Sequence, residues 1–173
     1  RATASPNGRT YEAFAAWLKY VETTVMRYKA SVNEWEIWNE PFGQGKDYAV
    51  MVLKTAALIK KIQPGAVVLV TAITDKDRQD VLDALKDANS LDLVDFWAYH
   101  PYTGNPDTSY AWVEKSQKLL AAYSPKYKLY QGEVGCPSIL EWTHALAHYP
   151  WTEYSQAKWN LRRMAGDRVR NIP

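Results

Sequence analysis

Three short motifs carry side chains that can do chemistry, and each comes at the end of an apolar stretch. They are Trp-Glu-Ile-Trp-Asn-Glu-Pro over 35–41, Tyr-His-Pro-Tyr over 99–102 and Gln-Gly-Glu-Val-Gly over 131–135. A carboxylate at the end of a buried strand, such as Glu40 or Glu133, is poorly placed for core packing but well placed to point into a cleft. Each motif also has a purely structural explanation. Asn39 and Pro41 favour a turn, a lone histidine such as His100 at a strand end is more often structural than catalytic, and Glu133 could cap the helix that follows it.

The combination of these motifs is more specific than any one of them. Two carboxyl groups on different strands can flank a glycosidic bond, where one donates a proton to the leaving oxygen and the other attacks the anomeric carbon. Their surroundings must differ, so that one stays protonated and the other ionised. A hydrogen bond from Tyr102 or His100 to Glu133 would stabilise the ionised form of that carboxyl group.

The elements that must position these residues follow from hydrophobic periodicity. The pattern predicts helices over 11–29, 47–63, 77–88, 110–123 and 152–170, and strands over 32–39, 66–74, 93–100 and 128–132. Asp47 is the expected N-cap of the second helix, and Pro64 and Gly65 mark its end. Strict alternation of strands and helices predicts an α/β fold with a parallel sheet and helices packed outside it.

Two architectures fit this alternation: an open doubly wound sheet and a (β/α)₈ TIM barrel. An open nucleotide-binding sheet normally has a glycine-rich turn after its first strand, and no Gly-x-Gly-x-x-Gly occurs here. Functional side chains at the carboxyl ends of strands are typical of the barrel. A full barrel takes about 250 residues, so we expect residues 1–173 to form a single partial barrel domain with strands four to seven. Strands one to three would be absent, and strand eight would follow Pro173.

The motifs resemble those of the retaining glycoside hydrolases of clan A, (β/α)₈ barrels that include cellulases, β-mannanases, β-xylosidases and β-galactosidases. The Asn-Glu pair that ends strand four in this clan matches Asn39 and Glu40. The nucleophile at the end of strand seven matches Glu133, and the His-x-Tyr pair of strand six matches His100 and Tyr102.

This resemblance covers nearly the whole chain and implies a role for each matched residue. Glu40 would be the catalytic acid/base, Glu133 the catalytic nucleophile, and Asn39 would bind the substrate 2-hydroxyl group. His100 and Tyr102 would contribute to substrate binding beside the nucleophile. The chain departs from the clan pattern in two places: it lacks the regions that carry the arginine near strand two and the aromatic residue of strand eight.

The aromatic composition is consistent with a sugar ligand. The chain has 8 Trp and 12 Tyr against 3 Phe, and Trp and Tyr combine a flat apolar face with a polar tip. Half-buried surface aromatics would explain this excess equally well. We expect Trp142 and Trp151, in the loop after the last strand, to stack against sugar rings. The expected substrate is an oligosaccharide, a polysaccharide or a simpler glycoside.

Several other partner classes are not expected. The net charge is +2, from 21 basic and 19 acidic residues, and no basic cluster indicates nucleic acid. No segment reaches the roughly 18 apolar residues of a membrane helix. His144 and His148 have the i, i+4 spacing of a metal pair, but no third ligand accompanies them, so we expect neither a metal nor a cofactor. A secreted or periplasmic location is slightly favoured over a cytoplasmic one.

A second functional hypothesis is a non-catalytic carbohydrate-binding or structural barrel fragment that lacks a complete site. The two glutamates favour an enzyme, whereas the absent strands favour the fragment unless another segment or chain supplies them. A retaining mechanism predicts that the carboxyl groups of Glu40 and Glu133 lie about 5–5.5 Å apart. It also predicts that Tyr102 lies within hydrogen-bonding distance of Glu133.

Overall fold

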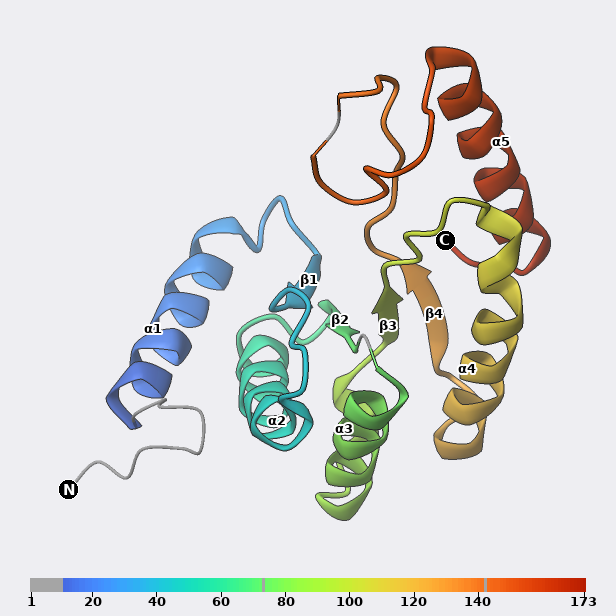
Figure 1. The fold of residues 1–173 in the computed structure, drawn as a ribbon. Helices are drawn as coiled ribbons and strands as arrows, with labels where there is room; N and C mark the ends of the chain where they lie inside the picture. The colour runs from blue at the N-terminus through green and yellow to red at the C-terminus, as the bar shows by residue number, and fades with distance from the viewer. Residues whose placement is uncertain (1–10, 73, 142) are drawn as a thin grey trace. The chain divides into compact units, whose positions relative to one another are not determined.

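The computed structural model describes residues 11–72, 74–141 and 143–173 (Figure 1). In chain order its elements are α1 (Tyr11–Tyr28), β1 (Glu34–Ile37), α2 (Gly45–Ile62), β2 (Val67–Thr71), α3 (Asp75–Asp87), η1 (Leu91–Leu93), β3 (Phe96–Tyr99), η2 (Pro106–Ser109), α4 (Tyr110–Tyr123), β4 (Lys128–Gln131) and α5 (Glu153–Val169). The four strands form one parallel sheet in the order β1-β2-β3-β4. The predicted consecutive strand order is therefore confirmed.

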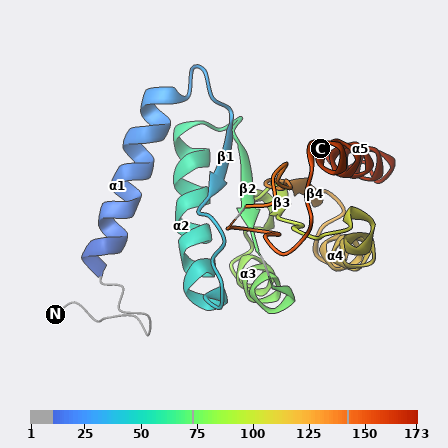
Figure 2. The ribbon, with the colours of Figure 1, turned by 45° about the horizontal axis from the view of Figure 1, so that its top comes forward.

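The chain divides into two compact units, of which the first ends at Trp97 and the second begins at Ala98. That residues 1–173 form a single partial-barrel domain stays a prediction. In the first unit β1 and β2 pair in parallel, with Glu34 opposite Val67 and Ile37 opposite Val70. Helix α2 runs alongside this strand pair (Figure 2). The near-continuous apolar run of β2 is buried from Val68 to Thr71, as expected for a parallel strand covered on both faces.

The second unit is built on β4, α4 and α5. Leu129 of β4 and Leu120 of α4 are fully buried, and Trp159 of α5 is buried as well. The backbone N–H of Gly132 donates to the carbonyl of Tyr99 at 3.2 Å, which connects the ends of β4 and β3. At the other edge of β4, the backbone N–H of Gln131 donates to the carbonyl of Pro173 at 2.9 Å.

Two predicted element boundaries are wrong for identifiable reasons. The strand expected over 32–39 ends at Ile37, because Trp38 and Glu40 have φ values of 62° and 45° and leave the extended conformation. The alternation of side chains therefore cannot be continued from β1 to Glu40. Helix α2 begins at Gly45, so Asp47 lies inside the helix and is not its N-cap. The end of α2 before Pro64 and Gly65 is as predicted.

The remaining differences are smaller. The strand expected over 93–100 begins only at Phe96, because 91–93 form the short helix η1. The helix expected over 110–123 has those bounds in the structure. None of the helices in the described part of the chain is long and apolar enough to cross a membrane.

Candidate active site

In the first unit, Asn39 and Glu40 lie in a turn directly after β1. Asn39 is exposed and Glu40 is half-buried. Trp38 and Glu40, on either side of Asn39, both have left-handed backbone conformations. Such conformations cost a non-glycine residue of order 1–3 kcal/mol each and persist only where the surroundings hold them. They cluster at functional sites, so this turn is a candidate site on backbone grounds as well as by its side chains.

Buried hydrogen bonds fix the strand end that precedes this turn. The hydroxyl of Tyr48, which is 1% exposed, donates to the carbonyl of Ile37 at 2.6 Å. Burial raises the pKa of Tyr48 far above its usual value, so this hydroxyl keeps its proton. One strand position earlier, the hydroxyl of buried Thr71 donates to the exposed carboxylate of Glu36. Glu36 thus accepts a hydrogen bond from the neighbouring strand although it is exposed in this chain.

An aromatic groove lies beside β1 within the same unit. It has a volume of about 610 Å³ and is lined from α1, β1 and α2, with the aromatic side chains of Trp17, Tyr20, Trp35 and Trp38. Asn39 also lines this groove. The rings of Trp17 and Trp38 meet edge to face with centroids 5.3 Å apart. The sequence signal for this groove was the excess of tryptophan, which did not indicate which tryptophans would gather.

In the second unit, Tyr102 and Glu133 are in direct contact. The hydroxyl of Tyr102 donates to Oε1 of Glu133 at 2.8 Å, which confirms the predicted contact. Glu133 follows β4 and is exposed, while Tyr102 and His100 follow β3 and are half-buried. The backbone N–H of Tyr102 donates to the carbonyl of His100 at 3.0 Å, so the two side chains leave one tight turn.

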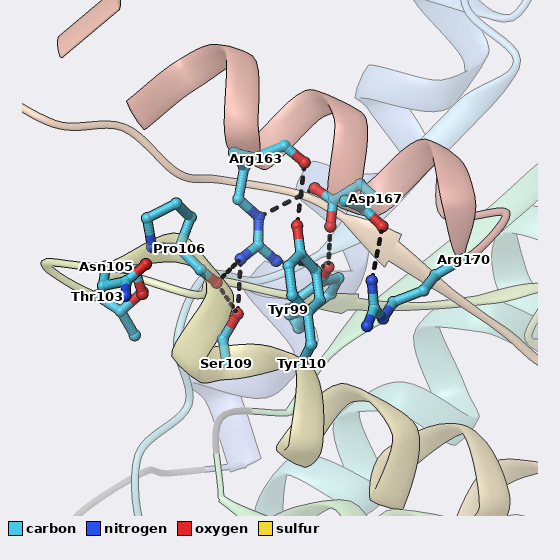
Figure 3. Close-up of polar contacts among 10 residues, drawn as sticks. Tyr99, Thr103, Asn105, Pro106, Ser109, Tyr110, Arg163, Asp167 and Arg170 are labelled. Atoms are coloured by element: carbon cyan, nitrogen blue, oxygen red, sulfur yellow. Dashed lines mark hydrogen bonds and ion pairs between the residues drawn. The ribbon is translucent and has the colours of Figure 1, made fainter. Parts of the chain in front are cut away.

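Helix α5 holds the loop that carries this turn. The indole N–H of Trp159 donates to the carbonyl of Thr103 at 2.9 Å. One helical turn further on, Nη1 of Arg163 donates to the carbonyl of Pro106 at 3.2 Å and to the hydroxyl of Ser109 at 2.6 Å (Figure 3). Arg163 and Ser109 are both buried. The loop from His100 to η2 is therefore fastened at several points before α4 begins.

The same arginine reaches the end of β3. Nη2 of Arg163 donates to the hydroxyl of Tyr99 at 3.0 Å, and that hydroxyl donates to Oδ1 of Asp167 at 3.1 Å (Figure 3). Asp167 also accepts from Nε of Arg163 at 3.0 Å. Burial raises the pKa of Tyr99 well above its usual value, so the hydroxyl stays protonated and can donate to Asp167. Sequence reasoning missed this group because its members lie far apart in the chain.

The loop after β4 contains the other predicted sugar-binding residues. Trp142 lies outside the described residues. Trp151 is 5% exposed, donates its indole N–H to the carbonyl of Leu146 at 2.7 Å and packs beside Tyr149. Stacking of a sugar on Trp151 stays a prediction that requires this loop to open. His144 and His148 lie in bend and turn conformations within this loop, as their placement in a loop predicts.

The structure thus brings together two groups of predicted residues. Asn39 and Glu40 share a turn in the first unit, and His100, Tyr102 and Glu133 come from two adjacent strand ends in the second. The distance between the carboxyl groups of Glu40 and Glu133 stays a prediction.

Comparisons with known proteins identify the fold. No family model and no curated protein matches the chain. Among solved structures, it resembles the β-D-glucuronidase of Dictyoglomus thermophilum, with a TM-score of 0.66 and 16% identity over 91% of this chain and 27% of that one. A GH2 β-galacturonidase from Eisenbergiella tayi bound to galacturonate gives 0.67 and 17%, over 95% of this chain and 29% of that one.

A GH10 endoxylanase from a sugarcane soil metagenome gives a TM-score of 0.52 and 15% identity, over 84% of this chain and 47% of that one. This chain therefore spans about a quarter to a half of the length of these enzymes. At such identities the likeness concerns the fold. The chain has the α/β architecture of part of a TIM barrel, and the structures that it resembles are those of glycoside hydrolases.

Proposed function

We propose that this chain is the part of a retaining β-glycoside hydrolase that carries both catalytic glutamates. The observation that carries the proposal is the hydrogen bond from Tyr102 to Glu133 at 2.8 Å, on a fold found in glycoside hydrolases. This hydrogen bond orients the carboxyl group that follows β4, the position that the resemblance to clan A gives to the nucleophile. We therefore assign Glu133 as the nucleophile and Glu40 as the acid/base.

The reaction proceeds by double displacement. An oxygen of Glu133 attacks the anomeric carbon while Glu40 protonates the departing glycosidic oxygen, and a covalent glycosyl-enzyme forms. Glu40, now ionised, then takes a proton from water, which attacks the same carbon and releases Glu133. Because Oε1 of Glu133 accepts the hydrogen bond from Tyr102, the other oxygen is the attacking atom. Asn39 binds the 2-hydroxyl group, and His100 binds the same sugar.

The proposed substrate is a β-linked oligosaccharide, polysaccharide or aryl glycoside. Trp38, which is 44% exposed beside Asn39 and Glu40, offers an apolar ring to a sugar face. The mechanism uses only protein side chains and water, with no metal or cofactor.

A complete site requires further barrel strands, which we propose another segment or chain supplies. The chain covers 27% of the β-D-glucuronidase and 29% of the β-galacturonidase named above. That coverage also favours a second function, in which the chain on its own binds carbohydrate without cleaving it or serves only as part of a barrel.

Hydrolysis of a panel of aryl β-glycosides tests these proposals. It should be measured for this chain and for a version that contains a complete barrel. Glu133→Gln should abolish turnover, whereas Glu153→Gln, an exposed glutamate at the start of α5, should leave it unchanged. Wild-type turnover in Glu133→Gln would contradict the assignment of the nucleophile.

Azide provides the test for Glu40. In Glu40→Ala, an aryl glycoside with a good leaving group should still form the glycosyl-enzyme, because such a group needs little protonation. Azide needs no general base, so it should restore turnover and yield a β-glycosyl azide. If neither version hydrolyses any glycoside but either binds oligosaccharides, the second function is supported instead.

A further inference from the structure

Asp77 is a buried acidic residue that the proposed mechanism does not use. It lies in the first turn of α3 and is 3% exposed. Its Oδ1 accepts the backbone N–H of Gly45 at 2.9 Å, and its Oδ2 accepts the backbone N–H of Gly43 at 3.3 Å and the hydroxyl of Thr74 at 2.6 Å. A buried carboxylate is costly unless hydrogen bonds satisfy it, and three donors from two segments do so here.

These hydrogen bonds join α3 to the turn that carries Glu40. Gly43 lies between Glu40 and α2, and Gly45 is the first residue of α2. The backbone N–H of Phe42 donates to the carbonyl of Glu40 at 2.8 Å, so Gly43 is tied closely to Glu40. Asp77 therefore supplies the N-terminal cap of α2 from a different helix, where the sequence suggested Asp47.

The turn is anchored at both ends by buried side chains. On the side of β1, Tyr48 donates to the carbonyl of Ile37, and on the side of α2, Asp77 accepts from Gly43 and Gly45. Trp38 and Glu40, the two non-glycine residues with positive φ in this turn, lie between these anchors. Strained conformations of this kind persist when the surrounding structure over-determines them, and the two anchors provide that constraint.

The glycines in the turn allow the backbone to approach Asp77 closely. A Cβ atom at Gly45 would lie 2.5 Å from Oδ2 of Asp80 and 3.1 Å from Cα of Asp77. Gly43 has φ of +63°, a conformation that side-chain-bearing residues rarely adopt. The contact of this turn with the start of α3 thus depends on both glycines.

We propose that Asp77 is a positioning residue for Glu40, because it holds the turn that presents the acid/base. The role of Glu40 itself rests on the proposed function. If Asp77 served only to cap α2 and to bind Thr74, the N-cap of α3, its loss would lower stability without selecting one chemical step. If it positions Glu40, its loss impairs the steps that need proton transfer and spares those that do not.

The test compares Asp77→Asn with Asp83→Asn, an exposed aspartate on the same helix. With an alkyl β-glycoside, kcat/KM of Asp77→Asn should fall roughly tenfold or more, because departure of the alkoxide needs acid catalysis. With a 2,4-dinitrophenyl glycoside, kcat/KM should change less than about twofold, because that leaving group needs little acid. Azide should raise kcat of Asp77→Asn on the second substrate, whereas Asp83→Asn should behave as wild type throughout.

Equal losses on both substrates, with no effect of azide, would show that Asp77 is only a structural residue. Thr74→Val is a milder second variant if Asp77→Asn does not fold, because it removes one donor to Oδ2 and keeps the carboxylate. Thr74→Val should change the ratio of kcat/KM on the two substrates in the same direction as Asp77→Asn, by a smaller factor.

Backbone hydrogen exchange tests whether Asp77 holds the turn, and it requires no measurement of activity. In Asp77→Asn the amides of Gly43 and Gly45 should exchange about tenfold faster or more, while that of buried Val52 in α2 should not change. Unchanged exchange at both glycines would overturn the proposal. If neither the wild-type chain nor the version with a complete barrel hydrolyses a glycoside, the proposed function fails, whereas the exchange rates still decide whether Asp77 holds this turn.

Discussion

At the scale of single residues, the main feature of the candidate site is the contact between Tyr102 and the carboxylate of Glu133. The carboxylate is exposed, and Tyr102 donates to one of its oxygens. The bond constrains the orientation of the carboxylate, because a phenol on a short loop offers one donor from one direction. The proposed nucleophile needs this constraint, since attack requires an oxygen aligned with the anomeric carbon.

Tyr102→Phe isolates this hydrogen bond. The substitution keeps the ring and removes the hydroxyl, so kcat/KM for an aryl β-glycoside should fall about ten- to a hundredfold, the range for a hydrogen bond to a charged group. Tyr154→Phe is the matched control, because Tyr154 is 78% exposed on α5. Steady-state kinetics of the two variants give the comparison. A Tyr102→Phe enzyme as active as Tyr154→Phe would contradict the role of this hydroxyl.

At the scale of elements, the sequence predicted the type and order of every long helix and strand in the described residues. The reason is that apolar periodicity is strong in segments such as 67–71 and 110–123. The boundaries near the site were harder to predict. Strand β1 ends before Trp38, which has a positive φ, and the residue types of this segment do not indicate such a conformation. The Tyr102–Glu133 contact could be predicted from adjacent strand ends in a parallel sheet. The contacts of Asp77 with Gly43 and Gly45 could not be predicted, because an acidic residue in the first turn of a helix is common.

The hydrogen bonds from α5 to the loop after β3 could not be predicted from the sequence either. Two of them come from Arg163, a cationic residue 2% exposed whose partners lie 4 to 64 positions away in the chain. A buried arginine is tolerated only where carboxylate, hydroxyl and carbonyl groups surround it. Residue spacing along one helix cannot show that such partners will come together.

Arg163→Leu measures the importance of this buried pair. The substitution leaves Asp167 buried without its cationic partner, so the free energy of unfolding should fall by about 3–5 kcal/mol. Arg168→Leu, an exposed arginine on the same helix, should change it by less than about 0.5 kcal/mol. Urea denaturation monitored by circular dichroism gives both values. Adding Asp167→Leu to Arg163→Leu should recover part of the loss, because the buried unpaired charge is then removed. Similar values for the two arginine variants would contradict the importance of the pair.

At the scale of the whole molecule, β1 is the feature with the largest consequence. In the described sheet it is an end strand that pairs only with β2. The aromatic groove runs along it, with Trp38 44% exposed. An end strand leaves one row of backbone groups without a paired strand and is a template to which a further strand can pair. The proposal that another segment or chain supplies barrel strands therefore has a defined location.

In a version of the protein that contains all eight barrel strands, the strand added beside β1 should cover this groove. A parallel strand added at β1 would form hydrogen bonds with the backbone of 34–37 and shield the rings of Trp17 and Trp38. With 5-fluorotryptophan incorporated, the ¹⁹F resonance of Trp38, assigned with Trp38→Phe, should lose most of its H₂O/D₂O solvent shift in the longer protein. Trp97, which is fully buried in this chain, should show little solvent shift in either version. The free energy of unfolding of the longer protein should also rise, because burial contributes about 25 cal/mol per Å² of apolar area. If the solvent shift of Trp38 is the same in both proteins, the added strand does not lie against β1, and a barrel completed at that edge is excluded.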